Sequence, residues 1–583
     1  MADSIQRHAA PNLADASFPI DLSPMLGRVF MARGARCSDD IDLSMSSLLS
    51  PSLLMGIDAA VDLIIAAMES DARILIVGDF DADGATSCAL AIRAFEAMGH
   101  SDVRFIVPNR FEYGYGLTPE IVDLAKPQNP SLIITVDNGI SSVEGVAAAR
   151  AAGIDVLVTD HHLPGHQLPN ANVIVNPNQH GCEFPSKALA GVGVIFYVMS
   201  AVRAGLRKKQ WFNDTRKEPN MADFLDLVAL GTVADVVPLD KNNRILVEQG
   251  LRRIRVGKCS AGIRALIEVS GRSAAKLIAS DMGFALGPRL NAAGRLDDIS
   301  IGIACLLTND VAMAKDIATE LDSMNQDRRQ IEQGMQVQAE TALARLEQDK
   351  STELPIGMCL FNDEWHQGVV GILASRIKDL HQRPVICFAL ANDNEDCSEL
   401  KGSARSIKGF HIRDALDAVA AHNPGLIDKF GGHAMAAGLS LKKDKFADFS
   451  KAFDKEASRL LTEDDLQSCV MSDGALAPDE ISIDNATLIH YATPWGQLFP
   501  EPIFDNEFLV VQQRIVGSKH LKLVLGMDDG TGQIVDAIAF NIDIKAWPDE
   551  SVKKVRAAYR LDVNRFRGQE TVQLIIEHLE KVS

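Results

Sequence analysis

Short apolar runs alternate with segments of helical apolar spacing through residues 73–176. Nearly continuous apolar runs predict strands that are buried on both sides, and the segments between them predict helices. The expected strands are Ile74–Val77, Val103–Val107, Leu132–Val136, Val156–Thr159 and Val173–Val175, and the expected helices are Ala85–Ala97, Pro119–Leu124 and Ser142–Ala152. Strands that alternate with helices in this way form a parallel, doubly wound sheet. The pattern therefore predicts an α/β domain with helices on both faces of one sheet.

The pattern changes at residue 310. Residues Asp310–Asp349 contain almost no glycine or proline, and their apolar residues recur at helical spacing. This predicts one helix of about 40 residues, or about 60 Å at a rise of ~1.5 Å per residue. Such a helix either presents a coiled-coil surface to a partner or connects two lobes. We favour the connector, because a new block with strand-like runs at Met358–Phe361 and Val385–Phe388 follows it.

Five strand-like runs follow in residues 507–583. They are Phe508–Val516, Leu521–Leu525, Ile534–Phe540, Arg556–Val563 and Thr571–His578, and the turn sequence DDGTG separates the second from the third. Five short strands in one compact segment favour an OB-type β-barrel, a fold that often holds single-stranded nucleic acid by stacking and charge. The candidates for such contacts are Phe508, Lys519, Lys522, Phe540, Arg565, Phe566 and Arg567.

A chain of 583 residues is too long for a single hydrophobic core. The expected parts are an N-terminal lead-in with a helical segment (1–70), a first α/β domain (71–309), the connecting helix (310–350), a second α/β domain (351–464) and a linker with the barrel (465–583). We expect the first residues of the lead-in to be loose.

Composition narrows the class of protein. Nine scattered cysteines without a CxxC pair argue against a disulfide framework and a zinc site. The longest uncharged run, Ala188–Val202, has 15 residues, which is shorter than a membrane span needs, and the N-terminus lacks the order of a signal peptide. We therefore expect a cytoplasmic protein that does not contact the membrane. The formal net charge of −20 opposes general binding of nucleic acid, but a local basic groove can coexist with an acidic exterior.

Acidic residues and histidines follow the expected strands at their carboxyl ends. Asp79, Asp81 and Asp83 follow the first strand, Asp137 follows the third, and Asp160, His161 and His162 follow the fourth. In a doubly wound sheet these strand ends lie at one edge, where ligands bind. Neighbouring carboxylates repel one another unless a cation neutralises them, and oxygen ligands favour Mg²⁺ or Mn²⁺. The sequence therefore predicts a metal site at this edge.

Two other interpretations of the acidic stretch explain less. A solvated acidic turn does not explain why three separate strand ends carry such residues. A calcium EF-hand loop has acids at positions one, three and five, but Leu90 stands at position twelve, where the bidentate glutamate belongs. The loop also follows a strand, whereas an EF-hand loop follows a helix.

One more carboxylate, Asp235, lies in the apolar segment Phe224–Leu239. We expect this segment to be a helix that breaks near Gly231 and Pro238. A carboxylate in apolar surroundings needs a partner. Asp235 is therefore either a further metal ligand or a helix-end residue paired with Arg244.

The motifs GDFDADG, VDN, DHH and GTVADVVPL occur in this order and resemble the DHH phosphoesterase superfamily. Four later motifs, PRLNAAGR, WHQGVVGILASR, GSARS and FGGHAMAAG, resemble the members of that superfamily that degrade single strands in the 5′→3′ direction. The resemblance covers roughly residues 30–583. It implies that the first α/β domain is a DHH domain, the second a DHHA1 domain and the C-terminal barrel an OB-type fold. One departure is Val77, where many members carry a histidine.

The resemblance also implies roles for individual residues. Two metal ions, Mn²⁺ or Mg²⁺, are expected on Asp79, Asp81, Asp83, Asp137, His161 and Asp235. Asp137 would bridge the ions, and His162 would face the scissile phosphate as the second catalytic residue. Substrate contacts are expected from Asp160, Arg289, Asn291, Arg295, His366, Ser375, Arg376, Ser403, Arg405, Gly432 and His433, although each arginine could equally be a structural salt-bridge partner.

The expected activity is hydrolysis of single-stranded DNA from its 5′ end to mononucleotides, in DNA recombination and repair. Paired divalent ions suit this reaction because they activate water and neutralise charge on the phosphate. The expected partners are single-stranded DNA, a helicase and a single-strand-binding protein, and we expect a monomer. The alternatives are a catalytically inactive DHH scaffold that binds single strands, and a DHH phosphodiesterase for small nucleotides. The retained carboxylates argue against the first alternative, and the barrel with the long helix argues against the second.

Overall fold

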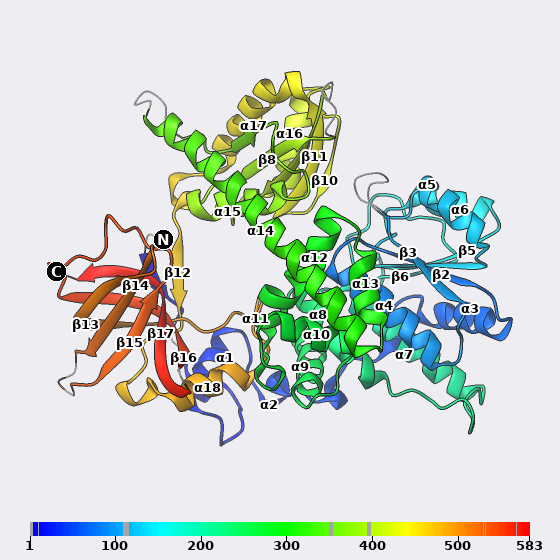
Figure 1. Ribbon diagram of the computed structural model, residues 1–583, viewed down its shortest axis with the longest axis horizontal. Coiled ribbons are helices and arrows are strands. Elements are labelled where there is room, and N and C mark those ends of the chain that lie inside the picture. The colour runs from blue at the N-terminus through cyan, green and yellow to red at the C-terminus, as the bar shows by residue number, and fades with distance from the viewer. Residues whose placement is uncertain are drawn as a thin grey trace.

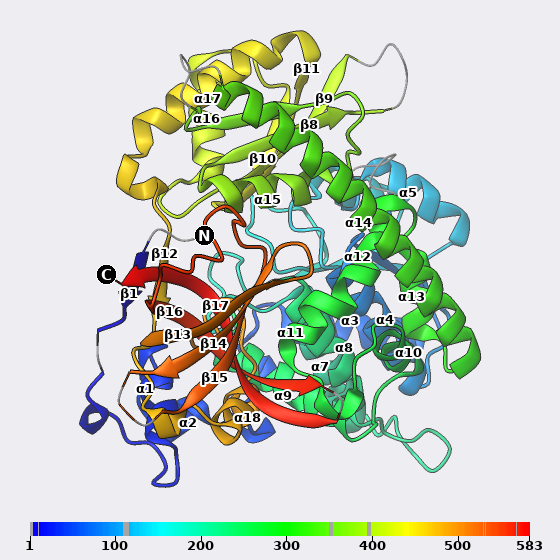
Figure 2. The same cartoon turned by 60° about the vertical axis from the view of Figure 1, so that its left-hand side comes forward.

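The computed structural model describes residues 4–582 except 10, 109–115, 349–353, 393–397, 529, 531 and 567. Figure 1 shows an α/β lobe with a helical layer on the right, a second α/β lobe at the top and a β-barrel on the left. One long helix, α14 (Val311–Gln348), runs from the helical layer to the upper lobe, and Figure 2 shows the same path from another side. The predicted long helix between two lobes is confirmed.

The first lobe contains a parallel sheet in the strand order β3-β2-β4-β5-β6. Its strands are β2 (Ile74–Gly78), β3 (Val103–Ile106), β4 (Leu132–Val136), β5 (Asp155–Thr159) and β6 (Val173–Val175). The direction in which strands are added reverses between β2 and β4, which is the point where ligands bind in such sheets. The structure confirms the predicted doubly wound parallel sheet.

Helices cover both faces of this sheet because the side chains of β2 alternate between two cores. Ile74 and Ile76 join the core with α3, α4 and α7, whereas Leu75 and Val77 join the core with α5 and α6. The bounds are α3 (Ile57–Glu69), α4 (Ala82–Ala97), α5 (Pro119–Ala125), α6 (Val143–Ala151) and α7 (Gly191–Lys208).

A helical layer follows the sheet and packs beside α4 and α7. Its members are α8 (Leu225–Ala234), α9 (Lys241–Arg255), α10 (Ala261–Val269), α11 (Ala279–Asp281), the π-helical turn η7 (Met282–Leu286), α12 (Gly287–Leu296) and α13 (Ser300–Leu307). Long helix α14 joins two cores: Ala318 and Leu321 pack with this layer, whereas Met335 and Leu343 pack with the second lobe. This packing ties the two lobes to one helix.

The second lobe has a mixed sheet in the order β10-β11-β9-β8-β7. The strands are β7 (Met358–Phe361), β8 (Val385–Leu390), β9 (Glu399–Arg405), β10 (Lys429–Gly432) and β11 (Ala436–Lys442), and the helices are α15 (Val370–His381), α16 (Ile412–His422) and α17 (Phe446–Leu460). Only the pair β7–β8 is parallel among the described pairs of this sheet.

The C-terminal strands close into a barrel in the order β13-β14-β15-β17-β16, as predicted for an OB-type fold. They are β13 (Phe504–Val516), β14 (His520–Met527), β15 (Ile534–Ala539), β16 (Lys554–Phe566) and β17 (Gln569–Val582), and α18 (Ile483–Ala492) packs on β16.

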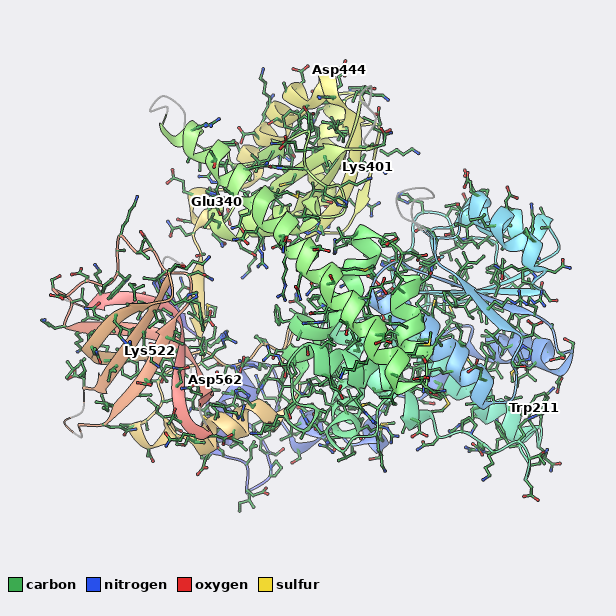
Figure 3. All side chains as sticks on the ribbon, in the orientation of Figure 1. Trp211, Glu340, Lys401, Asp444, Lys522 and Asp562 are labelled. Carbon is green, nitrogen blue, oxygen red and sulfur yellow. The ribbon has the colours of Figure 1, made fainter. Side chains whose placement is uncertain are left out.

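Three of the seven barrel residues predicted to bind a strand have another role. Phe508 is fully buried in the core, so its prediction is wrong. Lys522, labelled on the barrel in Figure 3, pairs with Asp536, and Arg565 pairs with Glu570. Lys519 and Phe540 are exposed. The Phe566 side chain and Arg567 lie outside the described residues.

The expectation of a loose start is wrong for residues 4–7. They form strand β1 (Ser4–Arg7), which pairs in parallel with β12 (Cys469–Ser472) before the barrel. Arg7 Nε lies 2.8 Å from Oδ1 of the buried Asp505 on β13. The first helices, α1 (Pro24–Ala32) and α2 (Ser38–Ile41), follow. The N-terminal segment therefore helps to hold the barrel.

Within the described residues, no single helix is long and apolar enough to cross a membrane. One bent pair, Met45–Leu53 with Ile57–Glu69, meets the length and composition of a span when its two parts are taken together. The eight cysteines that the structure describes are free thiols.

Candidate metal centre and basic cleft

Four chain segments deliver acidic groups and a histidine to the carboxyl edge of the first sheet. Asp81 follows β2 and caps α4, accepting the N–H of Asp83 at 3.0 Å. Asp137 follows β4 with a φ of +62°, a left-handed conformation that is uncommon outside glycine and typical of functional sites. His161 follows β5, and Asp235 stands at the C-terminal end of α8. The topology of the sheet thus brings these groups together, as the strand pattern predicts.

The donor atoms form two neighbouring groups. One consists of Asp83, His161 and Asp235, the other of Asp79, Asp81 and Asp137, and in each the donors lie within 4.8 Å of one another. Asp137 Oδ1 lies 3.0 Å from His161 Nε2, so this carboxylate stands between the groups. Asp137 also combines with His161 and His162 in a third set of the same spacing.

Asp235 lies beside His161 and the other acidic groups of this edge, and not beside Arg244. Its Oδ2 lies 3.5 Å from His161 Nε2. The guanidinium of Arg244 instead lies over the ring of Phe499, 4.0 Å from its centroid.

The centre is buried and strongly acidic. Burial, together with repulsion by neighbouring carboxylates, raises the pKa of Asp83 to about 7 and the pKa values of Asp137 and Asp235 well above the usual range. Burial lowers the pKa of His161 to about 3, so its imidazole is neutral. Without a cation, crowded carboxylates repel one another and destabilise the folded state. Together with a neutral imidazole they are suitable ligands for Mn²⁺ or Mg²⁺. The residues therefore fit the predicted metal.

Two glycines make room for the acids. A Cβ atom on Gly191 would lie 2.6 Å from Asp137 Cβ, and one on Gly231 would lie 2.8 Å from Asp83 Oδ1. The N–H of Gly191 donates to Asp83 Oδ2 at 2.7 Å, at the start of α7. The segment breaks after Ala234, between Gly231 and Pro238 as predicted, and Gly231 itself lies within α8. The only sequence signal for this role is a glycine inside an otherwise apolar helix.

Asp160 positions the two histidines at the edge of the cavity that it lines with His162. It is 1% exposed, and its carboxylate accepts the N–H groups of Ile140, His161 and His162. Its Oδ1 also lies 2.7 Å from His162 Nδ1. The carboxylate oxygens of Asp160 are therefore occupied by protein donors, and its predicted substrate contact stays a prediction.

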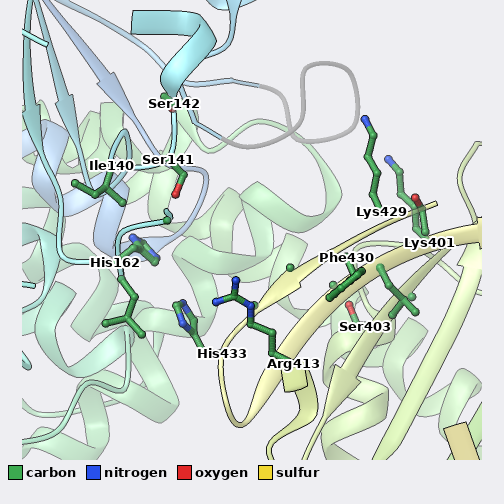
Figure 4. Close-up of a pocket in the computed structure, with 18 of the residues that line it drawn as sticks. Ile140, Ser141, Ser142, His162, Lys401, Ser403, Arg413, Lys429, Phe430 and His433 are labelled. Carbon is green, nitrogen blue, oxygen red and sulfur yellow. The ribbon is translucent and has the colours of Figure 1, made fainter. Parts of the chain in front are cut away.

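His162 faces the second lobe across a cavity of about 830 Å³. Burial alone would lower the pKa of His162, but the hydrogen bond and charge of Asp160 outweigh it and raise the pKa to about 9. His433 stacks against His162 with 6.3 Å between ring centroids, and Figure 4 shows His433 next to Arg413. Gly432 and Ser403 line the same cavity. The cavity therefore joins the carboxyl edge of the first sheet to the second lobe. We name the candidate ligand cluster at that edge the metal edge; it consists of Asp79, Asp81, Asp83, Asp137, His161 and Asp235.

A smaller cavity of about 190 Å³ adjoins Asp81. Four residues predicted to bind substrate line it together: Asn291, Arg295, Ser403 and Arg405. Asn291 Oδ1 accepts the N–H of Ala82 at 2.8 Å, which fixes α12 against the acidic loop. A Cβ on Gly371 would lie 2.9 Å from Arg405 Nη2, so the GVVG element leaves room for the arginine. We name this space the end pocket.

A basic cleft of about 740 Å³ continues from the end pocket toward the barrel, and the two share Asn291 and Arg295. Its charged lining residues are Arg295, Arg328, Arg329, Glu332, Arg376 and Lys519. Glu332 pairs with both Arg328, at 2.6 Å, and Arg376, at 2.9 Å. Five cations therefore face one carboxylate among the described lining residues, within a protein of net charge −20.

Three predicted substrate residues are not among the described residues that line these three cavities. Arg289 is buried and pairs with Asp322 of α14 at 2.7 Å, so it joins two helices. His366 Nδ1 accepts the N–H of Gly368, and Ser375 Oγ donates to the carbonyl of Gly371. The contact of Arg289 with Asp322 is a salt bridge between helices, which is the alternative that the sequence left open for each arginine.

Three segments match known family models. Residues 73–232 match the N-terminal domain of the DHH family, residues 355–459 match the DHHA1 domain, and residues 472–578 match the RecJ OB domain. With the parallel sheet, the acidic edge and the barrel, these matches define the class: a DHH-family protein with DHHA1 and OB domains.

Similarity over nearly the whole chain specifies the family. The chain is 55% identical over 567 residues to the single-stranded-DNA-specific exonuclease RecJ of Dickeya dadantii, and the alignment covers 97% of each protein. Crystal structures of RecJ from Thermus thermophilus in complex with Mn²⁺ and with Mg²⁺ match all of this chain and 80% and 79% of theirs, with TM-scores of 0.79 and 0.75 at 28% and 27% identity. The chain belongs to the RecJ family.

Proposed function

We propose that this protein is a metal-dependent exonuclease that degrades single-stranded DNA from its 5′ end and releases mononucleotides. The observation that carries the proposal is the end pocket, which adjoins the metal edge at Asp81 and contains two arginines. The name of the relative from Dickeya dadantii, a single-stranded-DNA-specific exonuclease, supports the substrate.

We further propose that two ions, Mn²⁺ or Mg²⁺, bind the metal edge. Asp83, His161 and Asp235 would hold one ion and Asp79 and Asp81 the other, with Asp137, which stands between the two groups, available to both. When bound, such ions activate water and neutralise charge on the phosphate. The complexes of RecJ from Thermus thermophilus with Mn²⁺ and with Mg²⁺ support either metal.

His162 and Asp160 act as a pair in the proposed reaction. Asp160 holds the imidazole of His162 in place through Nδ1, at 2.7 Å. A pKa of about 9 keeps His162 cationic at neutral pH, so its Nε2–H can donate to a phosphate oxygen. Asp160 is therefore a positioning residue, and His162 is the catalytic residue that touches the phosphate.

The end pocket explains the proposed action at a 5′ terminus. A terminal 5′-phosphate carries more negative charge than an internal one and matches the two guanidinium groups of Arg295 and Arg405. A space of about 190 Å³ has room for a single phosphate group and not for a second strand. Because so narrow a pocket needs a substrate that is already unwound, we propose that the enzyme works with a helicase and a single-strand-binding protein. We also propose that it is a cytoplasmic monomer.

Digestion of end-labelled oligonucleotides tests this proposal. With Mn²⁺ or Mg²⁺, a 5′-labelled single strand should release labelled mononucleotide at once, while a 3′-labelled strand should shorten gradually and the matching blunt duplex should stay intact. Equal cleavage of duplex, or first release from the 3′ end, would contradict the proposal. Binding without hydrolysis in either metal would favour the inactive scaffold, and cleavage confined to dinucleotides would favour a small-nucleotide phosphodiesterase.

A further inference from the structure

An exposed phenylalanine stands on the lining of the basic cleft. Phe284 is 79% exposed and lines the cleft together with Arg295, Arg329 and Lys519. Among the phenylalanine, tyrosine and tryptophan side chains that the structure describes, only Phe284 and Phe540 are largely exposed. Phe540 directly precedes Asn541, which lines the same cleft from the barrel. One of the two exposed aromatic rings, that of Phe284, therefore lines the basic cleft, and the other belongs to a residue next along the chain to a lining residue.

The turn that carries Phe284 is held firmly. Phe284 lies in the π-helical turn η7, whose residues Met282, Ala285 and Leu286 are buried. A Cβ on the adjoining Gly287 would lie 3.0 Å from Ala234 Cβ, so the turn packs closely on the end of α8. π-Helical turns are rare and occur often at functional sites. The fold thus fixes the backbone at Phe284 while leaving its ring in solvent.

We propose that Phe284 is a stacking platform for one base of the DNA strand, and that it helps the enzyme select single strands. This inference rests on the proposed exonuclease function and adds a residue that determines specificity. The cations of the cleft bind phosphates, and the ring between them offers an apolar face to the base of the same nucleotide. A paired base is already stacked within its duplex and cannot use such a platform.

The charges around Phe284 favour a nucleotide over an apolar protein partner. Arg328, Arg329, Arg376 and Lys519 line the same cleft from three different elements and would all lose water under an apolar protein surface. Arg328 and Arg376 share Glu332 as their counter-charge, so the cations that a phosphate would neutralise and an apolar partner would not are chiefly Arg329 and Lys519. A strand that leaves the end pocket toward the barrel brings a phosphate and a base to this point together.

Binding of DNA with single abasic positions tests the inference. Dissociation constants are measured without divalent metal, so that no hydrolysis occurs, for 5′-phosphorylated single strands in which one base at a time is missing. The wild-type protein should lose affinity on the order of tenfold at one position, the base over Phe284. Phe284→Ala should bind the intact strand on the order of tenfold more weakly and should be insensitive to the missing base at that position.

Matched variants separate stacking from general apolar contact. Phe284→Trp should restore both the affinity and the sensitivity to the missing base, whereas Phe284→Leu should not. Val256→Ala, at an apolar side chain 69% exposed at the end of α9, should leave binding unchanged. Identical abasic profiles for the wild type and Phe284→Ala would overturn the inference, and so would full rescue by leucine. Absence of 5′-directed digestion by the wild type would instead overturn the proposed function.

Discussion

The metal edge and the basic cleft are built in opposite ways. The metal edge is acidic and buried or half-buried, and its groups come from strand ends of one sheet and from the adjoining α8. The basic cleft is open and cationic, and its residues come from α12, α14, α15 and the barrel. In the proposed mechanism the metal ligands therefore all come from one domain, whereas the proposed path of the substrate depends on how α14 and the N-terminal strand β1 hold the lobes and the barrel together.

The largest effect is expected from the bridging carboxylate. Asp137→Ala should lower hydrolysis by on the order of 10³-fold or more in Mn²⁺ or Mg²⁺, because it removes the group that lies between both donor sets. Circular dichroism should show an intact fold. The control is Asp155→Ala, at the opposite end of β5, which should keep normal turnover. Unchanged turnover in Asp137→Ala would refute the assignment of the centre.

Arg405 tests whether the end pocket binds a terminal phosphate. Arg405→Ala should raise KM by about 10- to 100-fold for strands with a 5′-phosphate, because a charge-assisted contact is lost, and far less for strands with a 5′-hydroxyl. The comparison is Arg289→Ala, whose lost salt bridge with Asp322 should lower thermal stability and leave this phosphate preference intact. A KM that rises equally for both kinds of strand would remove the end-recognition role.

The basic cleft should contribute to the binding of long strands and not of short ones. Lys519→Ala should weaken binding of a long oligonucleotide by about two- to fivefold and reduce the slope of log K against log salt by about one. Turnover of a trinucleotide should not change, because a short substrate ends before the barrel. Truncation of the barrel is a poorer test, since its core is continuous with that of the first lobe. Equal losses on short and long substrates would contradict the proposed path.

The smallest effect is a dependence of stability on pH in the metal-free protein. The pKa values of Asp83, Asp137 and Asp235 are raised in the fold, so the folded state binds more protons than the unfolded state above the ordinary carboxyl pKa. Their contribution is present below that pKa and is lost as the pH rises through the folded values, near 7 for Asp83. In EDTA, the wild type should therefore lose a few degrees of unfolding temperature between about pH 5 and pH 8 relative to Asp235→Asn. A constant difference between the two proteins across this range would contradict the raised values.

The sequence predicts the metal edge better than the cleft, for a physical reason. Parallel strands place their carboxyl ends together, so Asp81, Asp137 and His161 are predictable from strand pattern alone. The predicted lobes, long helix and barrel follow equally from apolar periodicity. The enclosure of Asp160, the structural salt bridge of Arg289 and the burial of Phe508 depend on tertiary neighbours that a local pattern does not contain.

Phe284 is a second kind of failure of the local pattern, because the pattern predicts a buried side chain and the structure exposes it. In the sequence it lies within MGFAL, a short apolar run that reads as core. Only the π-helical turn, which buries Met282 and Leu286 but not Phe284, places the ring on the cleft. Similarly, the pairing of β1 with β12 joins segments more than 450 residues apart, and no local signal in the N-terminal residues predicts it.

The central claim is that acids and histidines from separate strand ends bind a pair of cations. Anomalous diffraction from crystals soaked in Mn²⁺ tests it most directly. We expect two manganese peaks, one among Asp83, His161 and Asp235 and one among Asp79, Asp81 and Asp137, with Asp137 touching both. Absence of any peak at this edge, or a single ion bound elsewhere in the chain, would contradict the account.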